Sequence, residues 1–443
     1  MNTRSVAFCT LGCKLNQFES AQMAGQMADA GFKVVRFDQL ADIYVINTCT
    51  VTHKGDHRCR AAIRKAQRKN ASAAIVVAGC GCQVAGETYA SIPGVTLILG
   101  NRDKMDIAAI LKGLGNDRDV VSSISPHQQH STGNEPMIDR FFDYSRAFVK
   151  VQEGCDSQCA YCIIPRARGP NRSMKPDWVI EQVQRLVEAG YQEIVLCGTH
   201  LGTYGSDLNE ALSLAALLRR MLDETGVRRV RLSSIEPREF TDELIEEIAS
   251  ETRICRHLHI PLQSGCDSVL CAMNRDYTTA DYSALIKRLK RGRAGICIGA
   301  DVIVGFPAEL NREFELTSEF IQDLDLSYLH VFSYSTRPGT PAAEKYRSSD
   351  LIPSEEIKSR SKILRGISSA KRHAFCTSEV GSKLDVLVLK KIDEKSGRRL
   401  SLSDNYINVL VDADASFAGQ IIDVELTSFS GELAMGERTS VPY

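Results

Sequence analysis

Apolar, β-prone runs alternate with helical stretches along most of this 443-residue chain, and that alternation limits the folds it can adopt. Strands separated by helices pair in parallel, because a helical crossover returns the chain to the same edge of the sheet. We therefore predict an α/β protein whose residues 1–115 form an open, doubly wound parallel-sheet domain. Its expected strands are residues 5–8, 43–47, 74–78 and 95–99.

A second alternation follows a stretch rich in Asn, Asp, Ser, His and Gln, which we interpret as a linker over residues 116–140. Six βα units then fill residues 141–373. Six units are too few for the eight-stranded barrel and favour an open, partial barrel with its chemistry on the loops after the strands. The expected strands are residues 148–151, 193–197, 229–233, 257–261, 299–304 and 328–332.

The C-terminal residues show a different pattern, because short β-prone runs follow one another without helices between them. A helical stretch over residues 354–373 ends the central domain, and residues 374–443 are predicted to fold as a small antiparallel β-barrel. The expected strands are residues 383–389, 398–403, 406–411, 421–427 and 432–435.

The composition excludes several classes of protein. Lysine and arginine number 54 against 55 acidic residues, so a polyanionic partner must be met by local basic patches. The first residues lack the apolar run of a signal peptide, and no segment offers about 18 uninterrupted apolar residues for a bilayer span. We expect a soluble, cytoplasmic protein that does not associate with membranes. In that compartment the 15 cysteines are packing, metal-ligating or reactive residues rather than a disulfide framework.

Three of these cysteines crowd into one loop. Cys155, Cys159 and Cys162 follow CxxxCxxC spacing directly after the first expected strand of the partial barrel. Three soft thiolates on one loop suit an iron–sulfur cluster whose fourth iron has no protein ligand, whereas structural zinc requires four closed ligands. The alternatives are zinc with a distant fourth cysteine, or reduced cysteines in the core. The spacing and the barrel around it favour the cluster, with an open iron able to chelate a small molecule.

Three further cysteines each follow an expected N-terminal strand. Cys13, Cys49 and Cys80 can meet at one site, because loops at the carboxyl edge of a parallel sheet converge. Small buried hydrophobes are an equally good interpretation of this pattern alone. The cysteines that stand singly in apolar segments are predicted to serve packing: Cys9, Cys59, Cys197, Cys255, Cys266, Cys271, Cys297 and Cys376.

The sequence resembles the radical S-adenosylmethionine (SAM) superfamily, in which such a triad occupies this loop of a partial barrel. More narrowly, GCDSQCAYCIIPRARGPNRS, TLGCKLNQFES, NTCTVT, PLQSG and AMNRDYT are similar to motifs of the methylthiotransferases. The resemblance covers essentially the whole chain, including a C-terminal barrel similar to that family's RNA-binding TRAM domain. GCKLN, NTCTVT and CIIPRARG resemble the threonylcarbamoyl-specific branch of the family.

The resemblance implies two [4Fe–4S] clusters and SAM as cofactors. The radical SAM cluster would be held by Cys155, Cys159 and Cys162, and the cysteines at 13, 49 and 80 match those that hold an auxiliary, three-coordinate cluster. Cys82 stands where family members usually lack a thiol, so it competes with Cys80 as a ligand. We prefer Cys80, directly after Gly79. Because the two triads lie on separate domains, we expect two independent clusters.

The resemblance also places residues around SAM. Tyr161 would lie beside the adenine, with a buried packing tyrosine as the alternative. Gly198 and Gly202 follow the second barrel strand, where glycines permit close approach of the backbone to the methionine end. Glu236 in SSIEP and Gln263 in PLQSG occupy strand ends where polar contacts to SAM are expected.

Two groups of bases are candidates for contact with RNA phosphates. Arg166, Arg168 and Arg172 follow the cluster loop, and we predict that they contact tRNA. Residues 53–70 hold seven bases and one acid, which fit phosphate contact and a solvated amphipathic helix equally well. From Lys371 onward the chain has nine bases and eleven acids, so an RNA role of the C-terminal barrel rests on the resemblance.

The function implied by the resemblance is that of a tRNA methylthiotransferase, which adds a methylthio group at C2 of N6-threonylcarbamoyladenosine beside the anticodon. In such an enzyme one SAM methylates sulfur at the auxiliary cluster, and a second is cleaved to a deoxyadenosyl radical that abstracts the C2 hydrogen. The implied partners are tRNA, a low-potential electron donor of the flavodoxin or ferredoxin type, and a sulfur source. Alternative substrates are isopentenyladenosine in tRNA and an aspartate of a ribosomal protein. A non-catalytic iron–sulfur RNA-binding protein is the alternative from another class.

Overall fold

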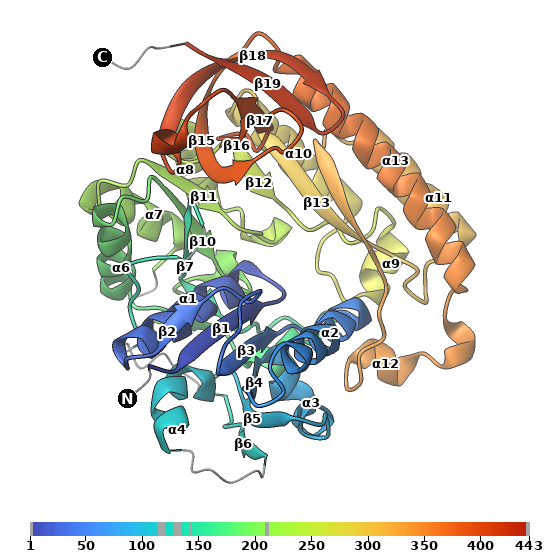
Figure 1. Ribbon diagram of the computed structural model, residues 1–443. Helices are drawn as coiled ribbons and strands as arrows, with labels where there is room; N and C mark the ends of the chain where they lie inside the picture. The colour runs from blue at the N-terminus through green and yellow to red at the C-terminus, as the bar shows by residue number, and fades with distance from the viewer. Residues whose placement is uncertain (1–2, 114–119, 128–134, 142–143, 209–211, 440–443) are drawn as a thin grey trace.

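The N-terminal residues form a six-stranded sheet in the computed structural model, and every strand pairing in it is parallel (Figure 1). The structure describes residues 3–113, 120–127, 135–141, 144–208 and 212–439. Across the sheet the strands are β2 (Lys33–Val35), β1 (Ser5–Thr10), β3 (Ile43–Thr48), β4 (Ala74–Gly79), β5 (Val95–Leu99) and β6 (Val121–Ser123). Its helices are α1 (Lys14–Asp29), α2 (His53–Lys69), α3 (Cys80–Ala90), the short 3₁₀ turn η1 (Asp103–Asp106) and α4 (Ile107–Gly113).

Each face of this sheet has its own hydrophobic core. On one face α2 buries Cys59, Ile63 and Ala66, which recur at helical spacing. On the other face α1 and α4 contribute Met23, Met27, Ile107 and Leu111. Helices therefore cover both faces, and the predicted doubly wound parallel sheet is confirmed.

The two edge strands were not predicted. β2 and β6 have three residues each, which is too short to stand out as an apolar run. β6 pairs with β5 inside the range interpreted as a linker, and Ile138 and Phe141 from the same neighbourhood lie in the core of the central domain. Residues 116–119 and 128–134 of the linker range lie outside the described residues.

Six parallel strands form the predicted open barrel of the central domain. One ladder contains β7 (Ala147–Lys150), β10 (Glu193–Cys197) and β11 (Arg229–Leu232), and the other contains β12 (His257–His259), β13 (Cys297–Val304) and β14 (Tyr328–Ser333). A single bridge between Val230 and Ile254 joins the two ladders. Within the described residues β14 does not pair with β7, so the barrel is open on that side.

The helices of the central domain surround this sheet (Figure 1). The longer ones are α6 (Pro176–Glu188), α7 (Leu214–Glu224), α8 (Asp242–Ser250), α10 (Thr279–Gly292), α11 (Asn311–Asp323) and α13 (Ser354–Ser378). Shorter elements are β8 (Gln152–Glu153), α5 (Ile164–Arg168), β9 (Arg172–Ser173), η2 (Leu201–Thr203), η3 (Pro237–Glu239), α9 (Asp267–Ala272), α12 (Pro341–Lys345) and η4 (Ser348–Asp350). None of the helices in the described ranges is both long and apolar enough to cross a membrane.

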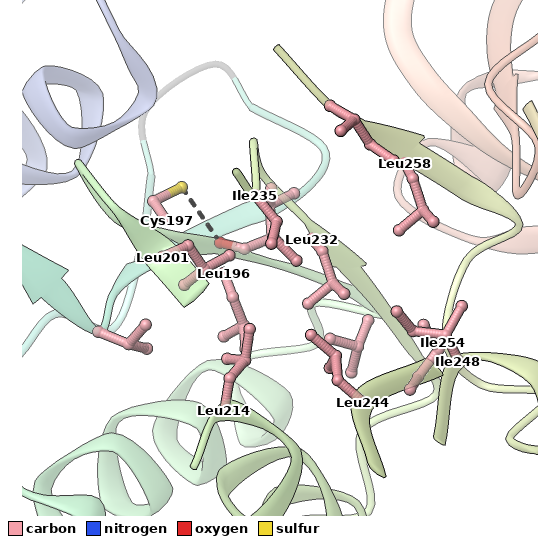
Figure 2. Close-up of a cluster of buried hydrophobic side chains, with 14 of the residues drawn as sticks. Leu196, Cys197, Leu201, Leu214, Leu232, Ile235, Leu244, Ile248, Ile254 and Leu258 are labelled. Atoms are coloured by element: carbon pink, nitrogen blue, oxygen red, sulfur yellow. Dashed lines mark hydrogen bonds between the residues drawn. The ribbon is translucent and has the colours of Figure 1, made fainter. Parts of the chain in front are cut away.

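The core of the central domain lies between the strands and these helices. Figure 2 shows Leu196 of β10 and Leu232 of β11 meeting Leu214 of α7 and Leu244 of α8. Side chains that face outward from the strands therefore pack against the surrounding helices.

The isolated cysteines mostly serve packing, as predicted. Cys197 in Figure 2 is 1% exposed, and its thiol donates to the carbonyl of Val195 (3.4 Å). Cys9 is half-buried. Cys271 is exposed, so the prediction is wrong for that residue. The other buried members of this set are Cys59, Cys255, Cys266, Cys297 and Cys376.

A closed barrel of five strands follows α13. Around the barrel the strands are β15 (Lys383–Ile392), β16 (Arg399–Ser403), β17 (Asn408–Val411), β19 (Leu433–Arg438) and β18 (Ile421–Ser430), with the turn η5 (Ala415–Phe417) after β17. The predicted small barrel is confirmed, but β17 and β19 pair in parallel while the other pairings are antiparallel. An odd number of strands cannot close with antiparallel pairs alone, so one parallel pair is unavoidable.

Buried charges fix this barrel to the central sheet. Arg231 of β11 is fully buried and pairs with Glu193 of β10 (Nε to Oε1, 3.0 Å). Its guanidinium also donates to the carbonyl of Ser403 (2.9 Å), and that of Arg229 donates to the carbonyl of Leu402 (3.0 Å). The C-terminal barrel therefore has a defined position on the central domain.

Candidate active site

Both cysteine triads open onto one cavity of about 360 Å³ between the N-terminal sheet and the central barrel. The carboxyl ends of β1, β3 and β4 bring in Cys13, Cys49 and Cys80, and the loop after β8 brings in the other triad, Cys155, Cys159 and Cys162. The triads were expected as separate sites because they lie on separate domains. The structure instead faces the two domains toward each other, so their thiols share one chamber.

The backbone holds the barrel triad in position. Gly154 has a φ of +77°, and a side chain at this residue would overlap the carbonyl of Pro170. The amide of Cys155 donates to the carbonyl of Gly169 (3.0 Å), and that of Cys162 donates to Cys159 (3.0 Å). All 15 cysteines of the chain are free thiols, so the loop owes its shape to these contacts.

Two cationic side chains face this triad. Burial acts to raise the pKa of Cys155, but His200, whose Nδ1 lies 3.3 Å from the sulfur, outweighs burial and lowers that pKa. Burial raises the pKa of Cys159, against the opposing charge of Arg275, whose Nη1 is 3.0 Å from the sulfur. Burial raises the pKa of Cys162 to about 12. Positive charge is thus available to thiolates at two of the three positions.

The N-terminal triad lies where three strand ends converge. Cys13 is the N-cap residue of α1, Cys49 follows β3, and Cys80 begins α3 directly after β4. Gly12 has a φ of +100°, and a side chain there would come within 2.8 Å of the Cβ of Cys49, so these loops approach closely. The amide of Asn101 lies 3.5 Å from the sulfur of Cys80. Burial raises the pKa of Cys49 to about 12.

Cys82 does not line this cavity. It is fully buried in the N-terminal core, where its thiol contacts Thr48, and burial raises its pKa. Cys80 faces the cavity instead. Two helical residues rotate a side chain by about 200°, which separates the two thiols because α3 begins at Cys80.

Four of the five residues expected around SAM line the cavity: Tyr161, Gly198, Glu236 and Gln263. Gly202 does not, because it lies against Glu239, whose side chain an added Cβ would overlap. The neighbouring Thr199 and His200 take that place in the wall. Contact between these residues and SAM remains a prediction.

Arg275 is a cavity residue that the sequence argument did not single out. Its guanidinium forms an ion pair with Glu236 and lies beside Cys159. It belongs to AMNRDYT, so the motif itself contained the signal, but the pairing became visible only in the structure.

A second polar group comes from three neighbouring strands of the barrel. Oδ1 of Asp301 lies 3.0 Å from Nε2 of His259 and 3.3 Å from Nδ1 of His330. Although burial opposes it, the two histidines lower the pKa of Asp301 to about 2. Asp301 and His330 are register partners, and Gly299, two residues before Asp301, is the partner of His259. The period of two along a strand thus puts all three side chains on one face.

Carboxylates hold two of the three arginines that were predicted to contact tRNA. Arg168 is 1% exposed and pairs with Glu19 and Glu153, with Nη1 to oxygen distances of 2.8 Å in both pairs. Arg172 is mostly buried and pairs with Glu153 (2.9 Å). Arg166 is the exposed member of the three. Contrary to the prediction, Arg168 has no exposed surface to offer a phosphate, because the carboxylates of Glu19 and Glu153 pair with it. Contact of Arg166 with tRNA stays a prediction.

Arg168 instead supports the wall behind the N-terminal triad. Its Nη2 donates to Oδ1 of Asn16 (2.7 Å), and both residues line the cavity. Nearby, the buried ammonium of Lys104 donates to Oδ1 of Asn101 (2.8 Å), the residue that contacts Cys80. Two buried cations therefore stand close to this triad.

Comparison with known families matches two parts of the chain. Residues 5–100 match a family described as uncharacterized protein family UPF0004, and residues 149–321 match the radical SAM superfamily. The threonylcarbamoyladenosine tRNA methylthiotransferase MtaB of Bacillus subtilis is 38% identical over 425 residues, which covers 95% of this chain and 93% of the relative. The chain belongs to the radical SAM methylthiotransferase family.

Other members of this family are similarly related. MtaB of Aquifex aeolicus is 37% identical and covers 91% of this chain and 96% of its own length. A tRNA-2-methylthio-N(6)-dimethylallyladenosine synthase of Moorella thermoacetica is 32% identical and covers 97% of both chains. Among solved structures, the radical SAM methyltransferase TsrM from Kitasatospora setae superposes with a TM-score of 0.56 at 17% identity, covering 78% of this chain and 74% of that one. That likeness supports the fold.

The cavity fits the [4Fe–4S] cluster and SAM that radical SAM enzymes use. The barrel loop offers three thiols and no fourth cysteine, as a cluster with an open iron requires. Among the described residues, buried polar atoms without a hydrogen-bond partner also lie in the wall, namely Thr199 Oγ1 and Arg275 Nε. Buried polar atoms are rarely left without partners, so their grouping indicates a polar ligand in this cavity.

Proposed function

We infer that this protein is a tRNA methylthiotransferase that adds a methylthio group to C2 of N6-threonylcarbamoyladenosine beside the anticodon. The observation that carries this conclusion is similarity to the Bacillus subtilis enzyme over 95% of the chain. The opening of both thiol triads onto one cavity supports it, because sulfur insertion needs a radical and a sulfur carrier close to one substrate atom.

The two triads take different roles in this proposal. Cys155, Cys159 and Cys162 hold the radical SAM cluster, and the N-terminal triad of residues 13, 49 and 80 holds an auxiliary [4Fe–4S] cluster. When bound, these groups and SAM supply the electron transfer, the radical and the methylthio group. The chain's own residues supply position, charge and exclusion of water.

The polar wall suits SAM. Glu236 offers a carboxylate for the ammonium or hydroxyl groups of SAM, and Arg275 offers a guanidinium for its carboxylate. Tyr161 adds an aromatic ring for the adenine, and Gly198 allows the backbone to approach the ligand closely. A low-potential electron donor and a sulfur source complete the proposed set of partners.

Charge behind the N-terminal triad favours a bound cluster. Three thiolates and their cluster carry net negative charge, which a buried site tolerates only beside cations. Arg168 and Lys104 supply those cations, and both are held by the buried carboxylate of Glu19. The auxiliary site is therefore built from both domains, with its thiols on one and Arg168 on the other.

Nucleoside analysis tests the substrate. Mass spectrometry of tRNA nucleosides from cells with and without this protein should show loss of 2-methylthio-N6-threonylcarbamoyladenosine and its return on re-expression. The methylthio form of isopentenyladenosine should stay unchanged. Loss of that nucleoside instead would move the protein to the isopentenyladenosine branch, and no change in either would leave a protein substrate or a non-catalytic role.

Cysteine variants test the two roles. Cys159→Ala should abolish both reductive cleavage of SAM to 5′-deoxyadenosine and methylthio transfer. Cys49→Ala should largely keep the cleavage and lose the transfer. Cys82→Ala is the matched control and should keep both, because its thiol lies in the core. Methylthiolated tRNA from the Cys49 variant at the parental rate would show that the N-terminal triad serves packing, and parental protein unable to cleave SAM would favour a non-catalytic iron–sulfur protein.

A further inference from the structure

One face of α2 is strongly basic. The helix and Asn70, its C-terminal cap, contain seven lysines and arginines and a single acid, Asp56. Its apolar side is buried against the N-terminal sheet, so the bases project from the opposite side. The exposed members are Lys54, Arg58, Arg64, Lys65 and Arg68.

The charges on this face have little compensation within the protein. Within the described residues, no ion pair or side-chain hydrogen bond is formed by Lys54, Arg58, Arg64 or Arg68. Asp56, the one acid of the helix, is already paired with Arg337 (2.8 Å). Like charges spaced four residues apart, as at positions 54 and 58 and at 64 and 68, repel each other. Such a face is stabilised by an anionic partner.

The helix starts at the proposed active site. Cys49 lies just before it, and the first turn is close enough that a Cβ added at Gly55 would be 3.8 Å from the Cys49 sulfur. Arg337, from the segment between β14 and α12, fastens the start of the helix by donating to Asp56 and to Oγ1 of Thr50 (2.8 Å each). Figure 1 shows α2 on the side of the N-terminal sheet that faces α9 and α12. From that start, 17 residues extend for about 25 Å.

We propose that the exposed basic face of α2 binds the phosphate backbone of the tRNA whose adenosine enters the cavity. The proposal rests on the proposed function, which supplies the polyanion. An RNA with one base in the cavity has phosphates on either side of it, and α2 offers a row of guanidinium groups leading away from the cavity. The C-terminal barrel has nine bases and eleven acids from Lys371 onward, so net positive charge for RNA must come from elsewhere in the chain.

Salt-dependent binding tests this surface. We would measure the affinity of the holoenzyme for the anticodon stem–loop between 50 and 300 mM KCl, comparing the parent with Arg64→Gln/Arg68→Gln. Each lost phosphate contact reduces the slope of log K against log salt by about 0.7 to 0.9, so two contacts should flatten it by about 1.5. Affinity at low salt should fall roughly tenfold or more. Arg64→Lys/Arg68→Lys keeps the charge and should keep most of the slope.

A matched control uses two bases far from the cavity. Lys362 and Arg365 are exposed on α13, on the outer flank of the molecule, and Lys362→Gln/Arg365→Gln removes the same charge (Figure 1). Its slope should equal that of the parent, and iron content should be unchanged in every variant. If the α2 variant and the control show the same slope, the proposal is overturned.

Two other outcomes separate the alternatives. If the α2 variant binds RNA normally but accepts electrons more slowly from a reduced flavodoxin, the face binds an acidic protein and the proposal is again overturned. If the parent itself neither binds nor modifies tRNA, the proposed function has failed. If the parent modifies tRNA and the slopes agree, the proposed function stands and this inference alone has failed.

Discussion

Replacing Arg168 tests how the two domains are joined around the cavity. Arg168 lies in α5 of the central domain, and its guanidinium contacts Glu19 and Asn16 of α1 as well as Glu153 of β8. Methionine is similar in length but carries no charge and no donors. Arg168→Met therefore leaves two buried carboxylates without their shared partner.

The expected loss in free energy of unfolding depends on which cationic partners the two carboxylates keep. Removing one member of a buried ion pair costs about 3–5 kcal/mol. Glu19 keeps Lys104 (2.6 Å), and Glu153 keeps Lys150 (3.2 Å) and Arg172 (2.9 Å), so we expect the lower end, about 3 kcal/mol. With a urea m value of about 3 kcal/mol/M, the unfolding midpoint should fall by about 1 M.

The single tryptophan of the chain reports on this interface. Trp178 in α6 packs edge to face against Phe18 of α1, with ring centroids 6.3 Å apart. Its fluorescence should therefore follow separation of the N-terminal sheet from the barrel. Arg166→Met is the control, because Arg166 is exposed and donates one hydrogen bond to a backbone carbonyl. Equal midpoints for Arg168→Met, Arg166→Met and the parent, at identical cluster loading, would refute the reasoning.

Three further predictions concern iron, domain docking and pH. Replacing Cys155, Cys159 and Cys162 together with alanine should remove about half the iron of anaerobically reconstituted protein, and loss of all or none would contradict a two-cluster assignment. Arg231→Met should weaken docking of the C-terminal barrel by about 3 kcal/mol, seen as faster amide exchange at its contact with β11, and unchanged exchange would show that the barrel docks without this charge. Although burial opposes them, Arg168 and Lys104 lower the pKa of Glu19 to about 2. The stabilisation by ionised Glu19 is present above the usual glutamate pKa and is lost as pH falls toward 2. The urea unfolding midpoint, followed by Trp178 fluorescence, should therefore drop between pH 5 and pH 3, and a midpoint that does not change with pH would contradict this prediction.

Much of the architecture could be predicted from local patterns. The buried strands β1, β3, β4 and β5 stand out because each is a short apolar run between turns and helical stretches. The spacing of Cys155, Cys159 and Cys162 is equally local, since all three lie on one loop. The three-residue edge strands β2 and β6 escaped prediction because their pairing depends on a neighbouring strand rather than on their own composition.

The arginines after the cluster loop show where local reasoning ends. In the sequence Arg166 and Arg168 are two bases of the same motif. Their local sequence does not indicate which of the two side chains is exposed and which is buried. The one helical turn of α5 directs them differently, so that Arg166 is exposed while Arg168 meets Glu19, 149 residues earlier in the chain. The buried guanidinium of Arg168 is stabilised by the carboxylates that pair with it, and those come from other elements.

The sequence by itself determined the three-part α/β architecture, the spacing of the barrel triad and the family, because strand and helix periodicity, loop spacing and motifs are properties of short segments. The tertiary structure decided that Cys13, Cys49 and Cys80 share one cavity with the barrel triad, that Cys80 rather than Cys82 faces it, and that α2 begins beside it. These facts depend on how two separately wound sheets pack against each other. That packing is set by contacts such as those of Arg168, which join residues far apart in the chain and leave no local pattern.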